Sequence, residues 1–185
     1  MNKADPSGNT IAIADPKQEK QIEAYINSRS AGTFKFNDKG ELKEVSKKSS
    51  NGKSKYYEGK LLKAIGNKAT ISVTIGQHYM DPSIGQSGAI QSVDRDAGGG
   101  VTQPKGGYER FGVNQSVIIS GHSHPLLDAR GHPMRDDAAD ILVHELVGHA
   151  IPWIVGSDTG DAVSDENKVR SENPGSGQRP PGHSE

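Results

Sequence analysis

The most apolar stretch of the chain predicts a helix close to its C-terminal end. Apolar side chains recur at helical spacing over residues 141–147. Asp136 and Asp137 place negative charge where this helix begins, and Pro152 limits how far it continues. Only 31% of the 185 residues are hydrophobic, and the mean hydropathy is -0.70. A chain of this length and composition fits one domain with a small core.

Shorter patterns predict the other elements. Apolar residues at spacings of three and four indicate helices, and alternating residues beside turn residues indicate strands. The expected elements are a helix over 17–28, a hairpin of 33–36 with 41–45, a helix over 56–65, strands over 69–75 and 116–120, and a helix over 165–172. This order favours an α+β fold in which the apolar helix packs against an antiparallel or mixed sheet.

Three segments lack the patterns that predict helices or strands of the core. Residues 1–16 contain two Asp-Pro turns and are interpreted as a connector from a larger delivery protein, so we expect the domain to cover residues 17–172. Residues 173–185 consist of Gly, Pro, Ser and charged residues and are expected to be a disordered tail. Residues 80–107 have no period and predict a long loop, with a role in covering a substrate.

The composition excludes several classes of function. The formal net charge of -1 provides no basic field for nucleic acid or for an anionic membrane surface. No apolar run is long enough to span a membrane, and the first 16 residues lack the apolar region of a signal peptide. Cysteine is absent, so a metal would have to be held by His, Asp or Glu.

The histidines point to such a metal. Five of the seven lie between His122 and His149. In the common zinc-peptidase helix, two histidines four residues apart project from one face, and the Glu after the first is the general base. Here Glu145 follows His144, but the second histidine, His149, comes five residues after the first. The segment therefore resembles that helix with one additional residue.

The additional residue has a geometric consequence. An α-helix turns by about 100° per residue, so it would place His149 about 140° away from His144, too far for both to hold one ion. A single π turn absorbs one residue and returns positions five apart to a common face. Gly148 offers little steric resistance to that distortion. We therefore expect the helix to be distorted over residues 146–148.

Residues 144–149 resemble the six-residue zinc motif of the dipeptidyl peptidase III family, which also has three residues between the Glu and the second His. In that family a Glu on a later helix completes the site. Residues 165–172 resemble that helix. Glu166 follows His149 by 17 positions (166 minus 149), close to the interval in thermolysin-like enzymes, whose third ligand is also a Glu. The resemblance implies a gluzincin-like site and a small zincin-like fold, in which a downstream helix supplies the ligand.

A second resemblance covers about residues 22–170. The chain is similar there to the zinc metallopeptidase domains at the C-termini of Rhs-type bacterial polymorphic toxins, through residues 30–34, the His144 helix and the Glu-Asn-x-x-Arg segment 166–170. Residues 5–9 resemble the end of the Rhs core, where toxin domains are joined. This similarity implies an effector without a signal peptide, delivered by a dedicated system such as type VI secretion. Its partners would be a protein substrate in the target cell and a cognate immunity protein.

Together these features predict a zinc-dependent endopeptidase. His144, His149 and Glu166 are the expected Zn²⁺ ligands, with the fourth position open for water. Glu145 is the expected general base, which takes a proton from that water and passes it to the leaving amine.

Several roles stay open in this site. Asp161 and Asp165 are rival third ligands. Arg170 lies four residues after Glu166 and is a candidate to orient its carboxylate. Donors for the oxyanion are proposed among Tyr79, Tyr108, His122, His124 and Arg170.

Two alternatives compete with this prediction. The segment Gly121-His122-Ser123-His124-Pro125 resembles the His-x-His motif of the JAMM isopeptidases, with Asp136 as the nearest downstream ligand. Asp136 is one position beyond the usual spacing. The other alternative is a non-enzymatic interaction module, in which the distorted helix only packs.

Overall fold

The computed structural model describes residues 11–46, 53–84, 88–105, 112–156 and 161–181. Its strands are β1 (Ile11–Ile13), β2 (Thr33–Phe36), β3 (Leu42–Ser46), β4 (Ile71–Ile75), β5 (His78–Asp81), β6 (Ala89–Ser92), β7 (Gly100–Pro104), β8 (Gln115–Ile119), β9 (His124–Leu127) and β10 (Pro133–Asp136). Its helices are a 3-10 turn (Pro16–Gln18), α1 (Glu19–Arg29), α2 (Lys55–Ile65), α3 (Val93–Asp96), α4 (Ala138–Val143), a π-helix (His144–Ala150), α5 (Ile151–Val155) and α6 (Ala162–Glu172). The chain is thus a mixture of helices and several small sheets, compatible with the expected α+β class.

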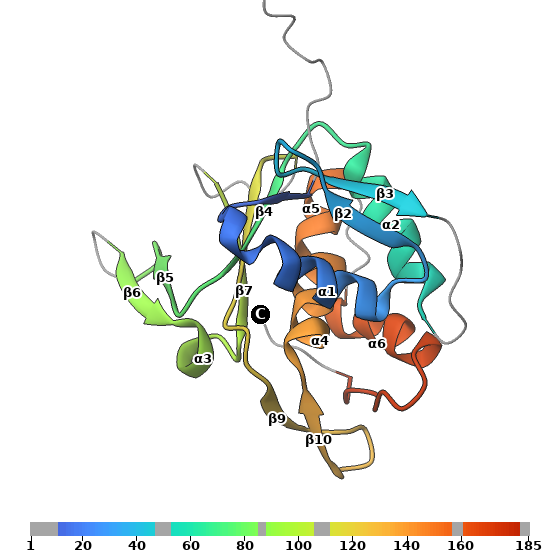
Figure 1. Ribbon diagram of the computed structural model, residues 1–185. Helices are drawn as coiled ribbons and strands as arrows, with labels where there is room; N and C mark the ends of the chain where they lie inside the picture. Colours follow the sequence, from blue (N-terminus) through green and yellow to red (C-terminus); the bar gives the residue numbers. More distant parts are fainter. Residues whose placement is uncertain (1–10, 47–52, 85–87, 106–111, 157–160, 182–185) are drawn as a thin grey trace, which may run out of the picture.

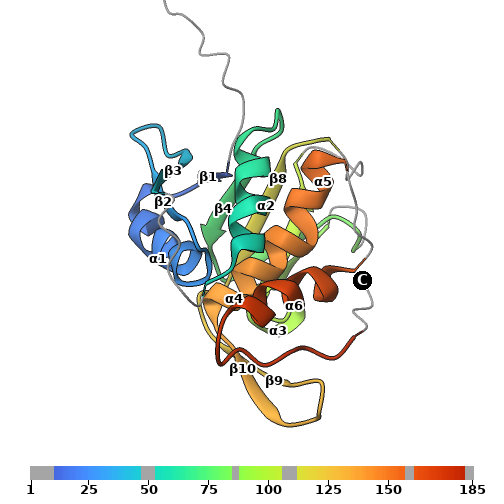
Figure 2. The ribbon, with the colours of Figure 1, turned by 90° about the vertical axis from the view of Figure 1, so that its right-hand side faces the viewer.

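A four-stranded mixed sheet is the base on which the helices pack. Its order is β1-β4-β8-β7, with β1, β4 and β8 parallel and β7 antiparallel at the edge. Ile71 and Val73 of β4 are fully buried, whereas Ser72 and Thr74, which alternate with them, are partly exposed. This is the alternation expected from the sequence, and it gives the sheet one buried face. The helices cover that face (Figures 1 and 2).

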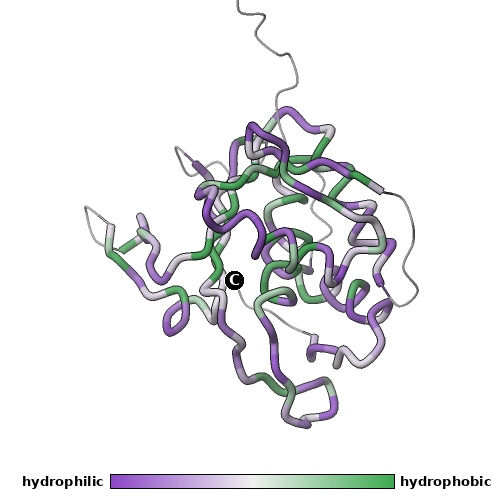
Figure 3. The backbone as a smooth tube through the Cα atoms, in the orientation of Figure 1, coloured by the Kyte–Doolittle hydropathy of each residue, from purple (hydrophilic) through white to green (hydrophobic). Residues whose placement is uncertain are grey.

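The predicted apolar helix is the centre of the molecule. It runs from α4 through the π-helix into α5, with Asp137 capping its start by accepting hydrogen bonds from two backbone amides. In the described part of the chain, residues 138–155 form a helix that is long and apolar enough to cross a membrane. However, 89% of these 18 residues are buried inside the protein, as in the core helix of a globular domain. Figure 3 shows the apolar residues concentrated in this helix and in the strands beside it. Pro152 lies just after the π-helix, and the helix ends three residues later at Val155, as expected from a proline that limits it.

The expected start of the domain near Lys17 is wrong. Ile11–Ile13 form β1, which pairs in parallel with β4, and Ile11 is fully buried. Asp15-Pro16 begins the 3-10 turn that leads into α1, with Asp15 accepting a hydrogen bond from the Lys17 amide. A three-residue strand is too short for a pattern in the sequence, and residues 1–10 lie outside the described part.

The expected long loop over residues 80–107 is also wrong for most of its length. It contains the hairpin β5–β6, the short helix α3 and the edge strand β7. The sequence of β7 shows no alternation of apolar and polar residues. The strand is held instead by hydrogen bonds to β8, which follows it in the chain. Residues 85–87 and 106–107 are not among those described.

The expected disordered tail is wrong for residues 173–181. This segment leaves α6 and runs past the hairpin β9–β10 (Figure 2). Asn173 is buried, and the Gln178 carbonyl accepts a hydrogen bond from the Ala129 amide. Polar contacts rather than apolar burial hold the segment, which explains why its composition resembles that of a disordered chain. Residues 182–185 lie outside the described part.

Candidate metal and catalytic site

The π-helix brings the two predicted ligand histidines together. His144 Nε2 and His149 Nε2 are 3.3 Å apart, and the ring centroids are 5.0 Å apart. Both residues are buried. Hydrogen bonds in a π-helix join residues five apart, so positions 144 and 149 share a face, as a regular α-helix would not allow. The predicted distortion of the helix is confirmed, and it extends over the whole of His144–Ala150.

The spacing of the two nitrogens suits a zinc ion. Two imidazole nitrogens that each lie about 2.0–2.1 Å from a tetrahedral zinc are about 3.4 Å apart. The observed 3.3 Å is close to that value. Within the described residues, no third His, Asp or Glu joins them in a group that could hold a metal ion. The two imidazoles therefore fit zinc, but they do not by themselves make a three-ligand site.

The predicted third ligand, Glu166, contacts the other side of the His144 ring. Its Oε2 lies 2.9 Å from His144 Nδ1. Arg170 Nε donates to Oε1 at 2.6 Å, and Arg179 Nη1 donates to Oε2 at 2.9 Å. Although burial raises the pKa of Glu166, the His144 contact and the charges of His144, Arg170 and Arg179 lower it to about 2. Glu166 is therefore an ionised carboxylate in the position from which such groups orient a metal-binding histidine.

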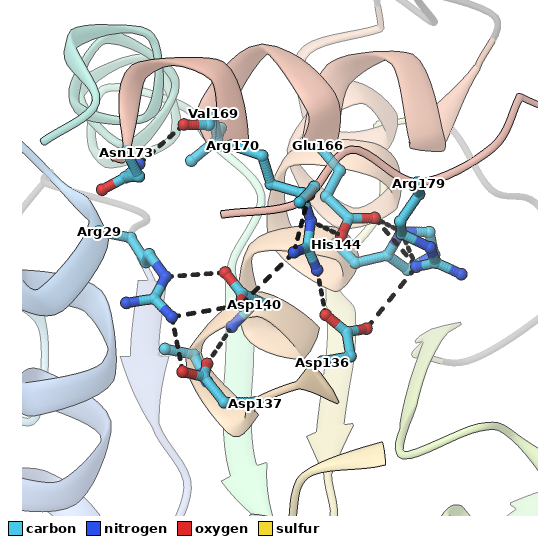
Figure 4. Close-up of polar contacts among 12 residues, drawn as sticks. Arg29, Asp136, Asp137, Asp140, His144, Glu166, Val169, Arg170, Asn173 and Arg179 are labelled. Carbon is cyan, nitrogen blue, oxygen red and sulfur yellow. Dashed lines mark hydrogen bonds and ion pairs between the residues drawn. The ribbon is translucent and has the colours of Figure 1, made fainter. Parts of the chain in front are cut away.

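Buried ion pairs hold Glu166 in place, as Figure 4 shows. Arg170 contacts Glu166, as predicted, and also pairs with Asp136 and with Asp140 Oδ2, the latter at 3.6 Å. Arg29 Nε donates to Asp140 Oδ1 at 2.7 Å. The chain of contacts joins α1, α4 and α6. Because breaking one partner of a buried pair leaves an uncompensated charge, this network resists displacement of the carboxylate.

Glu145 is buried between the π-helix and the edge strand β7. Thr102 Oγ1 donates to Glu145 Oε2 at 2.7 Å. A Cβ placed on Gly100 would lie 2.7 Å from Glu145 Oε1, so β7 can approach the carboxylate only with glycine at that position. Burial raises the pKa of Glu145, and the charge of His144 and the Thr102 hydrogen bond oppose part of the rise. A raised pKa suits a carboxylate that accepts a proton near neutral pH.

A small cavity of about 140 Å³ lies beside these groups. The residues that line it include Gly98, Gly100, Leu126, His144, Glu145 and Arg179. Arg179 and Thr102 were not identified from the sequence. The visible signal for Thr102 was the neighbouring triplet Gly98-Gly99-Gly100, which marks a close approach of the backbone to other groups.

The rival third ligands are engaged in other contacts. Asp161 caps α6 by accepting a hydrogen bond from the Val163 amide at 3.0 Å. Asp165 accepts hydrogen bonds from Tyr56 Oη at 2.6 Å and Lys168 Nζ at 2.8 Å, on the side of α6 that faces α2. Both carboxylates are thus used in positioning α6.

The isopeptidase-like set is not brought together. His122 Nδ1 and His124 Nε2 each contact Asp94, at 3.1 and 2.9 Å. Asp136 instead pairs with Arg170. Hydrogen bonds from Ser120, His122 and His124 lower the pKa of Asp94 to about 2, so this carboxylate stays ionised. Of the other proposed oxyanion donors, Tyr79 lies on β5 and Tyr108 is outside the described residues.

Gly148 sets how closely α6 approaches the π-helix. A Cβ at position 148 would lie 2.6 Å from Ala162 Cβ and 3.0 Å from Ala162 Cα. We expect Gly148→Ala to displace α6 and to lower the free energy of unfolding by about 1–3 kcal/mol, the usual cost of overpacking. Chemical denaturation measures the effect.

Gly59→Ala is the matched control, because a Cβ at this position in α2 would meet nothing within 4 Å. It should raise the stability by about 0.5–1 kcal/mol, since glycine is unfavourable inside a helix. Equal stability changes in the two variants would show that α6 does not pack against Gly148 in this way.

Comparison of the chain with protein-family models, with curated proteins and with solved structures finds no match.

Proposed function

We propose that this protein is a zinc-dependent peptidase that uses Glu145 as its general base. The observation that carries the proposal is the facing pair His144 Nε2 and His149 Nε2, 3.3 Å apart on a π-helix. Between them in sequence, Glu145 presents a buried carboxylate to the same small cavity that His144 lines. Two imidazoles with an adjacent carboxylate base are the components of metal-assisted peptide hydrolysis.

The residues of the chain have defined tasks in this reaction. Zinc held by His144 and His149 would supply Lewis-acid chemistry for the substrate carbonyl and the attacking water. As the water oxygen bonds to the carbonyl carbon, the carbonyl π electrons move to oxygen and Glu145 takes the released proton. Glu145 then gives that proton to the amide nitrogen as the C–N bond breaks. The hydrogen bond from Thr102 keeps the carboxylate in position throughout.

The proposed role of Glu166 in the metal site is to orient His144. Its contact with His144 Nδ1 favours the tautomer that carries the proton on Nδ1, which makes Nε2, the nitrogen that faces His149, the metal-binding atom. Direct ligation would require the carboxylate to leave Nδ1. Arg170 and Arg179 both hold it there.

The arrangement of elements supports a small zincin-like fold. The π-helix packs on β7 and β8, and α6, which carries Glu166, packs on the π-helix. We also propose, from the resemblance to Rhs-type toxin domains, that the chain is delivered into target cells and neutralised by an immunity protein. An enzyme that hydrolyses proteins inside a competitor is consistent with that role.

The test is metal analysis together with peptide cleavage. Protein purified without chelator should contain about one zinc per chain by elemental analysis, as one catalytic site requires. It should cleave members of a peptide library, detected by mass spectrometry; a chelator should stop the cleavage, and added zinc should restore it. Metal-free protein, or cleavage that is indifferent to chelator, would exclude the proposed function.

A further inference from the structure

The segment that follows α6 places Arg179 beside the candidate site. Asn167 on α6 binds the backbone of Arg179 twice, accepting from its N–H at 2.8 Å and donating to its carbonyl at 2.9 Å. The Gln178 carbonyl accepts from the Ala129 amide at 2.8 Å. These contacts come from α6 on one side and from the β9–β10 hairpin on the other. The backbone of Arg179 is therefore fixed beside the site.

The guanidinium of Arg179 is anchored through one of its nitrogens. Nη1 lies 2.9 Å from Glu166 Oε2, 3.3 Å from His144 Nδ1 and 3.9 Å from Asp136 Oδ2. Within the described part of the chain, Nη1 makes all of the side-chain contacts of Arg179, so Nε and Nη2 can donate elsewhere. In Figure 4 the outer nitrogen points away from both carboxylates. The side chain is only 16% exposed, and it lines the cavity that Glu145 also lines.

We propose that Arg179 is a catalytic residue of the peptidase proposed above, donating a hydrogen bond from Nη2 or Nε to the carbonyl oxygen of the scissile peptide. Negative charge develops on that oxygen when water adds to the carbonyl carbon, and a fixed cationic donor stabilises it. A guanidinium keeps its charge at every working pH. The inference rests on the proposed function and assigns it an oxyanion donor from the described residues.

Three of the candidate donors in the described part of the chain are occupied by other contacts. Arg170 is 1% exposed, and its guanidinium is paired with Glu166, Asp136 and Asp140. His122 and His124 both contact Asp94. Arg179 is the cation among the described residues that lines the cavity beside the proposed base.

The test compares Arg179→Ala and Arg179→Lys with wild type. We expect kcat of Arg179→Ala to fall about 10²- to 10³-fold, as when one oxyanion donor is removed, with KM little changed. Arg179→Lys should retain part of the rate. Zinc content should stay at the wild-type value, because Arg170 holds Glu166 independently. Arg130→Ala, in the exposed turn of the β9–β10 hairpin, is the control and should leave kcat unchanged.

Two further readouts separate catalysis from a structural role. Millimolar guanidinium chloride should restore part of the rate of Arg179→Ala and should not raise that of the wild type. A phosphinic peptide built on the wild-type cleavage sequence mimics the tetrahedral carbon, and its affinity by calorimetry should fall by about the same factor as kcat.

Unchanged kcat in Arg179→Ala, or loss of zinc or of folding in both variants, would overturn the assignment of Arg179. Such results would leave the proposed peptidase function of the wild type intact. A wild-type protein that binds no zinc or cleaves no peptide would instead overturn the proposed function itself.

Discussion

A Glu145→Gln variant is expected to bind about one zinc per chain and to hydrolyse peptides about 10²- to 10⁴-fold more slowly than the wild type, the usual contribution of a general base. Glutamine has nearly the same shape, and its amide oxygen can still accept the hydrogen bond from Thr102. The amide cannot take a proton from water. Metal content and structure should therefore be preserved while catalysis is lost. Initial rates on a peptide that the wild type cleaves, with zinc analysis of both proteins, give the comparison.

The same variant separates an enzyme from an interaction module. If the chain acts in cells by hydrolysis, expressing the wild type in a bacterium should stop growth, and expressing Glu145→Gln should not. Glu19→Gln, on the partly exposed start of α1, is the control and should behave as the wild type. A Glu145→Gln protein as toxic as the wild type would favour the non-enzymatic alternative.

Loss of either imidazole is expected to abolish zinc binding. His144→Ala and His149→Ala each remove one of the two nitrogens that face each other. A ligand that binds only the folded chain stabilises it by about 4 kcal/mol when its free concentration is 1,000 times Kd. Added zinc should therefore raise the thermal unfolding temperature of the wild type, and a chelator should reverse the rise. Neither histidine variant should respond to zinc.

Glu166→Gln should give a graded effect. If Glu166 orients His144, its loss should weaken zinc affinity about 10- to 100-fold, with full occupancy at high zinc. Failure to reach one zinc per chain would identify it as a direct ligand. His132→Ala is the control, because His132 is exposed in the turn of the β9–β10 hairpin. If His144→Ala and His149→Ala both bound zinc as the wild type does, the metal site would lie elsewhere in the protein.

Local patterns were enough to predict the helical and strand segments that build the core. Alternation over residues 69–75 corresponds to β4, and the spacing of Ile22, Tyr25 and Ile26 corresponds to α1. The distortion of the central helix could also be predicted, because a spacing of five positions between two candidate ligand histidines conflicts with α-helical geometry. These features depend on neighbours in the sequence, where periodicity carries the information.

Contacts between distant segments could not be predicted in this way. Thr102 meets Glu145 because β7 joins the sheet at its edge, and the neighbouring glycine triplet indicates a close approach of the backbone but not its partner. Arg179 reaches the site from a segment whose composition matches a disordered chain. Glu166 approaches His144 from the side on which Arg170 and Arg179 each contact one of its carboxylate oxygens. Each of these depends on tertiary structure rather than on a local pattern.

For the proposed zinc site, the π-helix also decides which state of the chain could bind the metal. In an unfolded chain that forms transient α-helical turns, the two imidazoles would diverge and could not chelate one ion together. They converge only when the helix adopts its wider turn, and α6 packs against Gly148 in that form. Metal capture would then be coupled to completion of the fold. A protein that passes through a secretion channel unfolded would acquire its zinc only after it refolds on the other side.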